Sequence, residues 1–394
     1  VGASAPPMKI LMISDVYFPR VNGVSTSIQT FRGELAARGH RVDLVAPAYP
    51  GGPGDEPGVH RVRSRGVPLD PEDRLMARSQ ARTTLQALER ERFDIVHIQT
   101  PFLAHYLGIA FARRQRVPVV ETYHTFFEEY LYHYVPFVPR AAMRALARTV
   151  SRRQAAQVDR LLVPSTAMRD KLADYGVGTP MQILPTGIPV DRLSGGDGRR
   201  FRAQHDLTPE DRVMLFVGRV AHEKNIGFLL HAFRQAAERS AGLRLVIAGE
   251  GPALPGLREL ADRLGVAART RFVGYLDRDG ALQDCYRAAD AFVFASRTET
   301  QGLVLLEALA LGVPVVALSV MGTRDVLEGQ PGALVAEDSV PEFAQAMLKV
   351  ATDDALRGRM AARAAEGVEA WRAGPLAERL IAAYDEVLAT AGSR

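Results

Sequence analysis

The chain has 394 residues, of which 47% are hydrophobic and 24% are charged, and its mean hydropathy is −0.05. This length predicts two or three domains that each bury a core, and the composition excludes a disordered chain and a multi-span membrane protein. The single cysteine, Cys285, excludes a disulfide framework and a cysteine-based zinc site and favours a reducing cytosol. The net charge of +4 and the pI near 9.3 leave nucleic-acid binding as a class to test.

Apolar runs alternate with amphipathic helical patterns along the first half of the chain. The run 9–14 is expected to be a buried strand, because Ser14 and Asp15 end it too early for a signal peptide. Residues 1–7 are left out of the predicted fold. Such alternation is typical of βαβ units with a parallel sheet. The predicted strands are 9–14, 41–46, 94–98, 117–122, 160–164 and 181–185, and the predicted helices are 25–38, 72–92, 102–115, 139–157 and 166–175.

A glycine-rich linker at 194–198 precedes a second alternation of the same kind. We therefore predict an α/β protein with two doubly wound, Rossmann-like domains, residues 8–190 and 191–374, that face a cleft. The charge divides at the same boundary: 24 basic and 17 acidic residues precede it, and 25 basic and 28 acidic residues follow it. The predicted elements of the second half are strands 212–217, 243–248, 270–273, 291–295 and 313–317, helices 225–238, 253–264, 278–288 and 303–311, and helices from 339 onward.

A loop with Asn22 and Gly23 follows the first strand and leads into a helix near Ser25. A glycine at this place lets an anion approach the backbone N–H groups of a helix N-terminus. The sequence has no G-x-G-x-x-G at this turn, so the nicotinamide and flavin fingerprint is missing. An ordinary turn between strand and helix explains this segment equally well.

Two cations follow the first strand of the second half, at Arg219 and Lys224. This pair suits a diphosphate, because arginine binds it as a fork and lysine as a point charge. The chain has four lysines against 45 arginines, so a lysine here argues against a merely solvated basic face. The next strand, 243–248, ends in a Gly-Glu-Gly-Pro loop at 249–252 that can approach a ligand closely.

Two acids, Glu299 and Glu307, surround the start of the predicted helix 303–311. Carboxylates accept hydrogen bonds in pairs and suit the vicinal hydroxyls of a sugar or ribose, and the first amides of the helix offer further donors. The alternative is that Glu299 is an ordinary acid at a helix start and that Glu307 is a surface residue. Glu307 lies within an apolar segment, where a carboxylate without a partner is costly to bury, and this favours a function.

The ordered set of these motifs resembles a retaining nucleotide-sugar glycosyltransferase of the GT-B fold, family 4. The resemblance rests on Glu299-x7-Glu307, Gly218-Arg219-x4-Lys224, Gly249-Glu250-Gly251-Pro252 and the Gly23 loop, and it extends from Met8 to the tail. It implies two Rossmann-like domains and a terminal helix, residues 375–394, that crosses back onto the first domain.

The resemblance also implies a role for each motif. Arg219 and Lys224 would bind the donor diphosphate, Glu307 the nucleotide ribose, and Glu299 the donor sugar together with the amides of 302–304. His124 would lie near the reacting centre; the resemblance carries this role, since a lone histidine is more often structural. The implied catalytic residues are His124, Glu299, Arg219 and Lys224. The implied donor-binding residues are Gly23, Arg219, Lys224, Gly249, Gly251, Tyr275 beside the base, Glu299, Gly302, Leu303, Val304 and Glu307.

The leaving diphosphate itself is thought to help deprotonate the acceptor in this family, and a cationic clamp would stabilise it. No metal ion is expected, on the premise that the sequence lacks an Asp-x-Asp metal signature. The nucleotide-sugar donor is a substrate rather than a cofactor.

Aromatic and basic residues gather in the first half. Seven of the 28 aromatic residues fall within 123–137, and a helical pattern with arginines at four-residue spacing follows. Such a basic stripe beside aromatic residues is typical of an interfacial membrane segment. Taken separately, the aromatic residues are explained equally well as part of a core, and the arginines as a solvated helix face. The candidate membrane or acceptor residues are Phe126, Phe127, Tyr130, Arg140, Arg144, Arg148 and Arg152.

The segments 122–125 and 299–302 resemble the diacylglycerol glucosyltransferase branch. Gln301 stands where many relatives carry an aromatic residue, and Asn22 and Gly23 stand where they carry two glycines. These departures leave the donor sugar and the acceptor open.

We therefore predict a cytoplasmic hexosyltransferase with peripheral contact to the anionic inner face of the membrane. It would move glucose from UDP-glucose to a lipid or other hydroxyl acceptor and form an α-glycosidic bond. The alternatives are a GDP-mannose donor, a soluble small-molecule acceptor, and, from a different class, a sugar-nucleotide epimerase. No nucleic-acid partner is expected, because the sequence has no helix-turn-helix, RNA-recognition or zinc-finger signature. The oligomeric state is left open.

Overall fold

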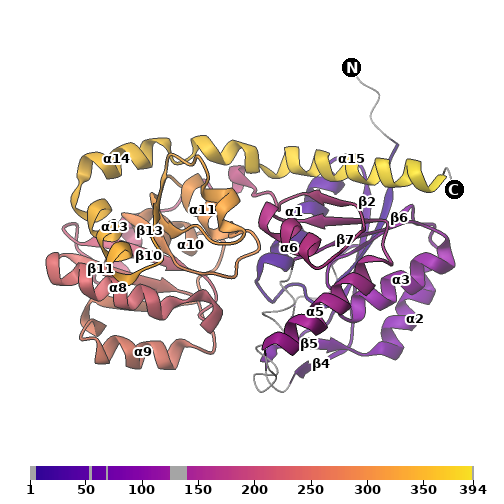
Figure 1. Ribbon diagram of the computed structural model, residues 1–394, viewed down its shortest axis with the longest axis horizontal. Helices are drawn as coiled ribbons and strands as arrows, with labels where there is room; N and C mark the ends of the chain where they lie inside the picture. Colours follow the sequence, from indigo (N-terminus) through magenta and orange to yellow (C-terminus); the bar gives the residue numbers. More distant parts are fainter. Residues whose placement is uncertain (1–5, 53–55, 68–69, 125–139, 393–394) are drawn as a thin grey trace. The chain divides into compact units, whose positions relative to one another are not determined.

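The computed structural model describes residues 6–52, 56–67, 70–124 and 140–392 (Figure 1). The chain divides into two compact units. Unit 1 comprises residues 1–187 and 373–394, and unit 2 comprises residues 188–372. The sequence analysis placed these divisions at 190 and 374.

Unit 1 is built on a seven-stranded parallel sheet with the order β3-β2-β1-β6-β7-β8-β9. The first strand lies in the middle, where Ile10 pairs with Val42 on one side and with Ile95 on the other. The chain therefore adds β2 and β3 on one side of β1 and then β6 to β9 on the other side. The strands are β1 (Lys9–Ile13), β2 (Arg41–Pro47), β3 (Val59–Val62), β6 (Ile95–Ile98), β7 (Val119–Thr122), β8 (Arg160–Val163) and β9 (Met181–Ile183).

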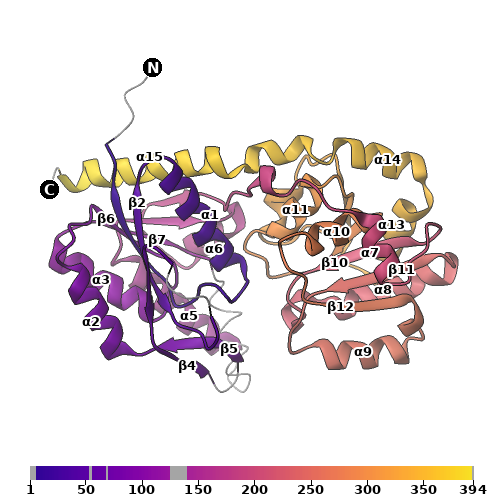
Figure 2. The ribbon, with the colours of Figure 1, turned by 180° about the vertical axis from the view of Figure 1, so that it is seen from behind.

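Successive residues of a strand point to opposite faces of the sheet, and in these strands the residues on both faces are mostly apolar. Helices therefore cover both faces. Ile10 and Met12 of β1 pack with one set of helices, and Leu11 and Ile13 pack with the other. The first face carries α1 (Gly23–Ala37) and α15 (Ala373–Gly392), which lie side by side in Figures 1 and 2. The second face carries α2 (Arg78–Leu88), α3 (Leu103–Gln115), α5 (Arg140–Ala155) and α6 (Thr166–Asp174).

The segment 59–76 differs from the sequence prediction. It contains β3 and an antiparallel pair of strands, β4 (Ser64–Val67) and β5 (Asp70–Met76), none of which was predicted. The predicted helix 72–92 was wrong at its start, because α2 begins at Arg78. The sequence of β5 is mostly polar, so it lacks the apolar alternation that marks a strand.

Unit 2 is built on a six-stranded parallel sheet with the order β12-β11-β10-β13-β14-β15. Its first strand again lies in the middle, so both units have the doubly wound topology that the sequence predicted. The sequence analysis missed β15, an edge strand of four residues. The strands are β10 (Arg212–Val217), β11 (Leu243–Ala248), β12 (Thr270–Gly274), β13 (Ala291–Phe294), β14 (Val315–Leu318) and β15 (Ala333–Ala336).

One continuous apolar core joins the sheet of unit 2 to the helices on both faces. In this core α8 packs against α13, and α7 packs against α10 (Figure 2). No helix in the described parts of the chain is both long and apolar enough to cross a bilayer. The helices are α7 (Gly198–Gln204), α8 (Ile226–Arg239), α9 (Leu254–Arg263), α10 (Ala281–Ala288), α11 (Leu303–Ala310), α12 (Thr323–Leu327), α13 (Val340–Thr352) and α14 (Asp354–Arg363).

Candidate active site

The central strands β10 and β13 of unit 2 bring two predicted site residues together. Lys224 ends the short helix η2 (His222–Lys224) after β10, and Glu299 lies in the loop after β13. Lys224 Nζ donates to Glu299 Oε1 at 2.5 Å, and both side chains are mostly buried. The two strands are parallel, but the chain continues from β10 toward one edge of the sheet and from β13 toward the other. Doubly wound sheets bind ligands in the crevice at the carboxyl ends of two such strands. The pair therefore lies where this topology collects ligands.

Hydrogen bonds hold the loops around this pair in place. Asn225 Nδ2 donates to the carbonyl oxygen of Ala295 at 3.0 Å, which joins the loop after β10 to the loop after β13. The backbone oxygen of Glu299 accepts from the N–H of Gly322 at 2.9 Å. One bond fixes the start of the loop after β13, and the other fixes the backbone of Glu299 itself. The protein therefore positions this loop before any ligand binds.

Gly249 and Gly251 allow close contact between the loops after β10 and β11. A Cβ atom on Gly249 would lie 1.9 Å from the carbonyl oxygen of Gly218, and one on Gly251 would lie 2.4 Å from that of Val220. Both glycines also have positive φ angles. Glycine is thus required here for backbone packing, and a role in donor binding stays a prediction.

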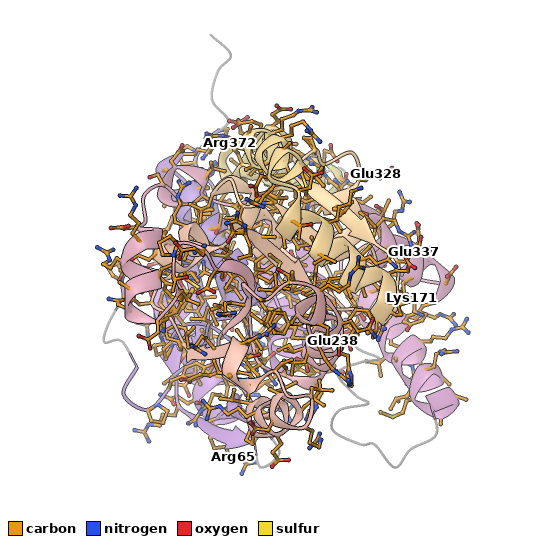
Figure 3. The ribbon with its side chains drawn as sticks, turned by 90° about the vertical axis from the view of Figure 1, so that its left-hand side faces the viewer. Arg65, Lys171, Glu238, Glu328, Glu337 and Arg372 are labelled. Carbon is orange, nitrogen blue, oxygen red and sulfur yellow. The ribbon has the colours of Figure 1, made fainter. Side chains whose placement is uncertain are left out.

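Glu307 is buried in α11 and has two partners from other elements. Arg278 Nη1 donates to Oε1 at 2.9 Å, and the Tyr286 hydroxyl donates to Oε2 at 3.0 Å. Other acids of unit 2, such as Glu238 and Glu337, lie at the surface (Figure 3). The sequence analysis took the cost of burying this carboxylate as a sign of function. Arg278 and Tyr286, which it did not identify, supply partners within the chain, so burial alone no longer argues for a ligand.

The remaining donor-side predictions of unit 2 lie in the loops after its strands and at the start of α11. Gly302 has φ +91° and is the N-cap of α11, so Leu303 and Val304 form the first turn, whose N–H groups have no partner inside the helix. Arg219 lies in the same loop as Lys224. Tyr275 follows β12 with 55% of its surface exposed, and the Gly274 oxygen beside it accepts from the N–H of Gly249 at 2.7 Å.

The start of α1 in unit 1 carries Gly23. Asn22 caps this helix, since its side chain accepts from the N–H of Ser25 at 2.8 Å. A Cβ atom on Gly23 would meet no atom within 4 Å in the part of the chain that the structure describes. The position is therefore open, and the backbone conformation does not demand glycine.

His124 follows β7 and contacts a residue that the sequence analysis did not identify. Its Nε2 lies 3.0 Å from Gln99 Oε1, just after β6. Because this oxygen can only accept, Nε2 carries the hydrogen and Nδ1 is left as an acceptor. Burial lowers the pKa of His124 to about 4, so the ring is neutral at pH 7.

Two further buried groups lie at the same strand ends of unit 1. Asp15 accepts from Thr100 Oγ1 at 2.7 Å and from the N–H of Ala104 at 3.0 Å, and burial raises its pKa to about 6. His97 lies between the Tyr384 hydroxyl of α15, at 2.6 Å, and Thr122 Oγ1, at 2.7 Å. Burial lowers the pKa of His97 to about 3. The sequence analysis did not identify His97, although a polar residue within the apolar run of β6 is a signal that could have found it.

The predicted basic stripe lies on α5. Arg144, Arg148 and Arg152 are exposed, whereas Met143 and Ala147 of the same helix are buried. The arginines therefore form an exposed face of unit 1, and its contact with a membrane stays a prediction. Phe126, Phe127, Tyr130 and the side chain of Arg140 lie outside the described residues.

The premise that the sequence lacks an Asp-x-Asp pattern, on which the expectation of metal independence rests, is wrong, because Asp277 and Asp279 form one. Asp277 Oδ1 accepts from the N–H of Asp279 at 3.0 Å, as in a turn. Within the described ranges, no group of three or more histidine, cysteine, aspartate or glutamate residues could hold a metal ion. Metal independence stays a prediction.

Comparison with known proteins follows the same two units. The family described as Glycosyltransferase Family 4 matches residues 21–192, and the family described as Glycosyl transferases group 1 matches residues 197–367.

Individual relatives agree with these matches. The alpha-monoglucosyldiacylglycerol synthase of Streptococcus pneumoniae is 34% identical over 79% of this chain and 71% of its own length. The synthase of the same name from Acholeplasma laidlawii is 29% identical over 78% and 80%. The sucrose-phosphate synthase structure from Thermosynechococcus elongatus has a TM-score of 0.79 at 20% identity, over 97% of this chain and all of that one. The fold and the family predicted from the sequence are therefore confirmed: this chain belongs to glycosyltransferase family 4 and is a glycosyltransferase of the GT-B fold.

Proposed function

We propose that this glycosyltransferase moves glucose from UDP-glucose to the free hydroxyl of diacylglycerol, with retention, at the inner face of a membrane. The Lys224–Glu299 pair at the central strands of unit 2 carries the donor half of this proposal. The names of the two synthases, which describe glucose on diacylglycerol, support the choice of sugar and acceptor.

The donor half assigns a role to each group around that pair. Lys224 and Arg219 would bind the diphosphate and stabilise the charge that develops on it as the sugar leaves. Glu299 and the first amides of α11 would hold the sugar hydroxyls, and Glu307 would hold the ribose. Tyr275 would lie by the base.

The acceptor half uses unit 1. His124 is neutral, and its Nδ1 can accept a hydrogen bond from a hydroxyl of the sugar. The leaving diphosphate would take the proton of the acceptor hydroxyl as the new bond forms on the same face. The exposed arginines of α5 would bind anionic lipid headgroups, each adding about 1 kcal/mol near the surface.

The test of the chemistry is a panel of donors and acceptors. The full chain is incubated with UDP-glucose, UDP-galactose or GDP-mannose, in each case with dioleoylglycerol in anionic vesicles or with a soluble sugar acceptor. We expect an α-glucosyl lipid from UDP-glucose, identified by the anomeric proton coupling of the product. Mannosyl transfer or a glycosylated soluble acceptor would overturn the proposed substrates, and donor interconversion without an acceptor would indicate an epimerase.

The test of the membrane contact is sedimentation with vesicles that contain phosphatidylglycerol. The double variant Arg144→Gln/Arg148→Gln is expected to lose most of its binding at low salt, because two exposed cations leave one helix face. The matched control is Arg82→Gln/Arg90→Gln, which removes two exposed cations elsewhere in unit 1. Equal binding of both variants would contradict a role for α5.

A further inference from the structure

Glu307 is held from two directions. Tyr286 is 1% exposed in α10, and its hydroxyl reaches Oε2 at 3.0 Å. Arg278 lies in the loop between β12 and α10, and its Nη1 reaches Oε1 at 2.9 Å. The two donors come from different elements and bind different oxygens of one carboxylate.

This arrangement leaves a defined capacity for further hydrogen bonds. An ionised carboxylate has two oxygens with about four acceptor sites in all. Tyr286 and Arg278 occupy one site on each oxygen, so one site on each oxygen remains. A vicinal diol offers two hydroxyl hydrogens, which match these two remaining sites.

We propose that Tyr286 and Arg278 are positioning residues that give Glu307 its selectivity for an intact ribose 2′,3′-diol of a nucleoside diphosphate. The inference rests on the proposed role of Glu307 in ribose binding. Tyr286 fixes the direction of Oε2 from within the core. Arg278 forms an ion pair with the carboxylate and fixes Oε1 from the more exposed loop.

The protonation states agree with these roles. Burial raises the pKa of the Tyr286 hydroxyl well above its ordinary value of 10, so the hydroxyl remains a donor. The Glu307 carboxylate raises the pKa of the Arg278 guanidinium, so the cation persists. A charged carboxylate without hydrogen-bond partners is costly to bury, so the two donors also stabilise Glu307 within the core.

The test compares the Kd of the full chain for UDP with its Kd for 2′-deoxy-UDP by titration calorimetry; GDP and 2′-deoxy-GDP replace them if the donor panel selects guanosine. The parent protein should prefer the ribonucleotide. We expect Tyr286→Phe to reduce this preference about five-fold and Arg278→Gln about ten-fold, with little change for the deoxynucleotide. Arg278→Lys should restore part of the preference, because it keeps the cation.

The controls separate positioning from general damage. Arg263→Gln removes an exposed arginine from α9 of the same unit and should leave both Kd values unchanged. A purely structural role of Tyr286 or Arg278 would weaken both nucleotides equally. Arg278 lies in a loop, so its variants keep the test valid if Tyr286→Phe fails to fold.

Glu307→Gln distinguishes failure of this inference from failure of the proposed function. If Glu307→Gln leaves the preference for ribose intact, the proposed ribose role of Glu307 is wrong. If Glu307→Gln abolishes the preference while folded Tyr286→Phe and Arg278→Gln keep it, the ribose role stands and the positioning role of the two partners is wrong.

Discussion

The central strands of the two units end in chemically different groups, although both sheets have the same topology. In unit 2 the loops after these strands hold the ion pair of Lys224 with Glu299, and a second ion pair joins Arg278, after the edge strand β12, to Glu307 in α11. In unit 1 they form hydrogen bonds of neutral imidazoles, such as His124 with Gln99, beside the carboxylate of Asp15, whose described hydrogen bonds come from Thr100 and Ala104. The doubly wound fold therefore does not determine the electrostatics of its own binding edge.

This difference follows from what each unit is proposed to bind. A diphosphate needs cations, and a cation already paired with a carboxylate can exchange one oxyanion for another with little cost. A sugar hydroxyl needs only dipoles, which a neutral imidazole supplies. The basic charge of the first half lies on its surface, as in Arg144 and Arg148 of α5, so the overall pI says little about either site.

The largest expected effect is on the charged side of the comparison. Lys224→Ala removes the cation next to Glu299, and we expect kcat/KM to fall about 100- to 1,000-fold, with weaker UDP binding and an unchanged fold. Lys349→Ala, which removes an exposed lysine from α13 of the same unit, is the matched control. Steady-state kinetics with UDP-glucose provide the measurement. Equal kcat/KM for the two variants would remove Lys224 from the site.

The second effect is the acid sensitivity of unit 1. The folded pKa of His97, about 3, lies below the ordinary 6.5, so the unfolded chain binds the proton first as the pH falls below 6.5. Stability is therefore lost on acidification, by about 2 kcal/mol for His97 between pH 7 and pH 5. His124 acts in the same direction, because burial lowers its folded pKa to about 4. Asp15 acts in the opposite direction, since its folded pKa, about 6, lies above 3.8.

His97→Gln should flatten this dependence, because glutamine offers a donor and an acceptor but does not titrate. Hydrogen exchange of the β6 and β7 peptides, corrected for intrinsic rates, measures the opening free energy of unit 1 at each pH. His231→Gln, which replaces an exposed histidine in α8 of unit 2, should behave like the parent. An unchanged slope in His97→Gln would mean that other groups cause the acid loss.

The sequence predicted the parts of this comparison that depend on strand ends. Lys224 and Glu299 follow two strands of one doubly wound half, so topology alone brings them to the same edge. The partners of Glu307 could not be predicted in this way. Arg278 lies in a loop and Tyr286 on a helix, and their directions depend on how α10 packs against α11.

The same limit applies to unit 1. His97 stands in an apolar strand and must have a partner, but that partner, Tyr384, is 287 residues away in the chain. The strands β4 and β5 escaped prediction for a different reason, because a short antiparallel pair with polar residues lacks the alternation of a buried strand.

The smallest expected effect compares the same chemical change in both units. Tyr384→Phe removes the hydroxyl that contacts His97 Nδ1 and should lower the stability of unit 1 by about 1–2 kcal/mol, because a buried polar group loses its partner. The value of kcat/KM for the nucleotide-sugar donor should change less than two-fold, because Tyr384 joins α15 to His97 and is not proposed to contact a ligand. Tyr286→Phe removes an equally buried hydroxyl in unit 2 but should change nucleotide selectivity. If Tyr384→Phe altered donor kinetics without lowering stability, the buried hydrogen bonds of unit 1 would belong to its chemistry, and the contrast with the ion pairs of unit 2 would fail.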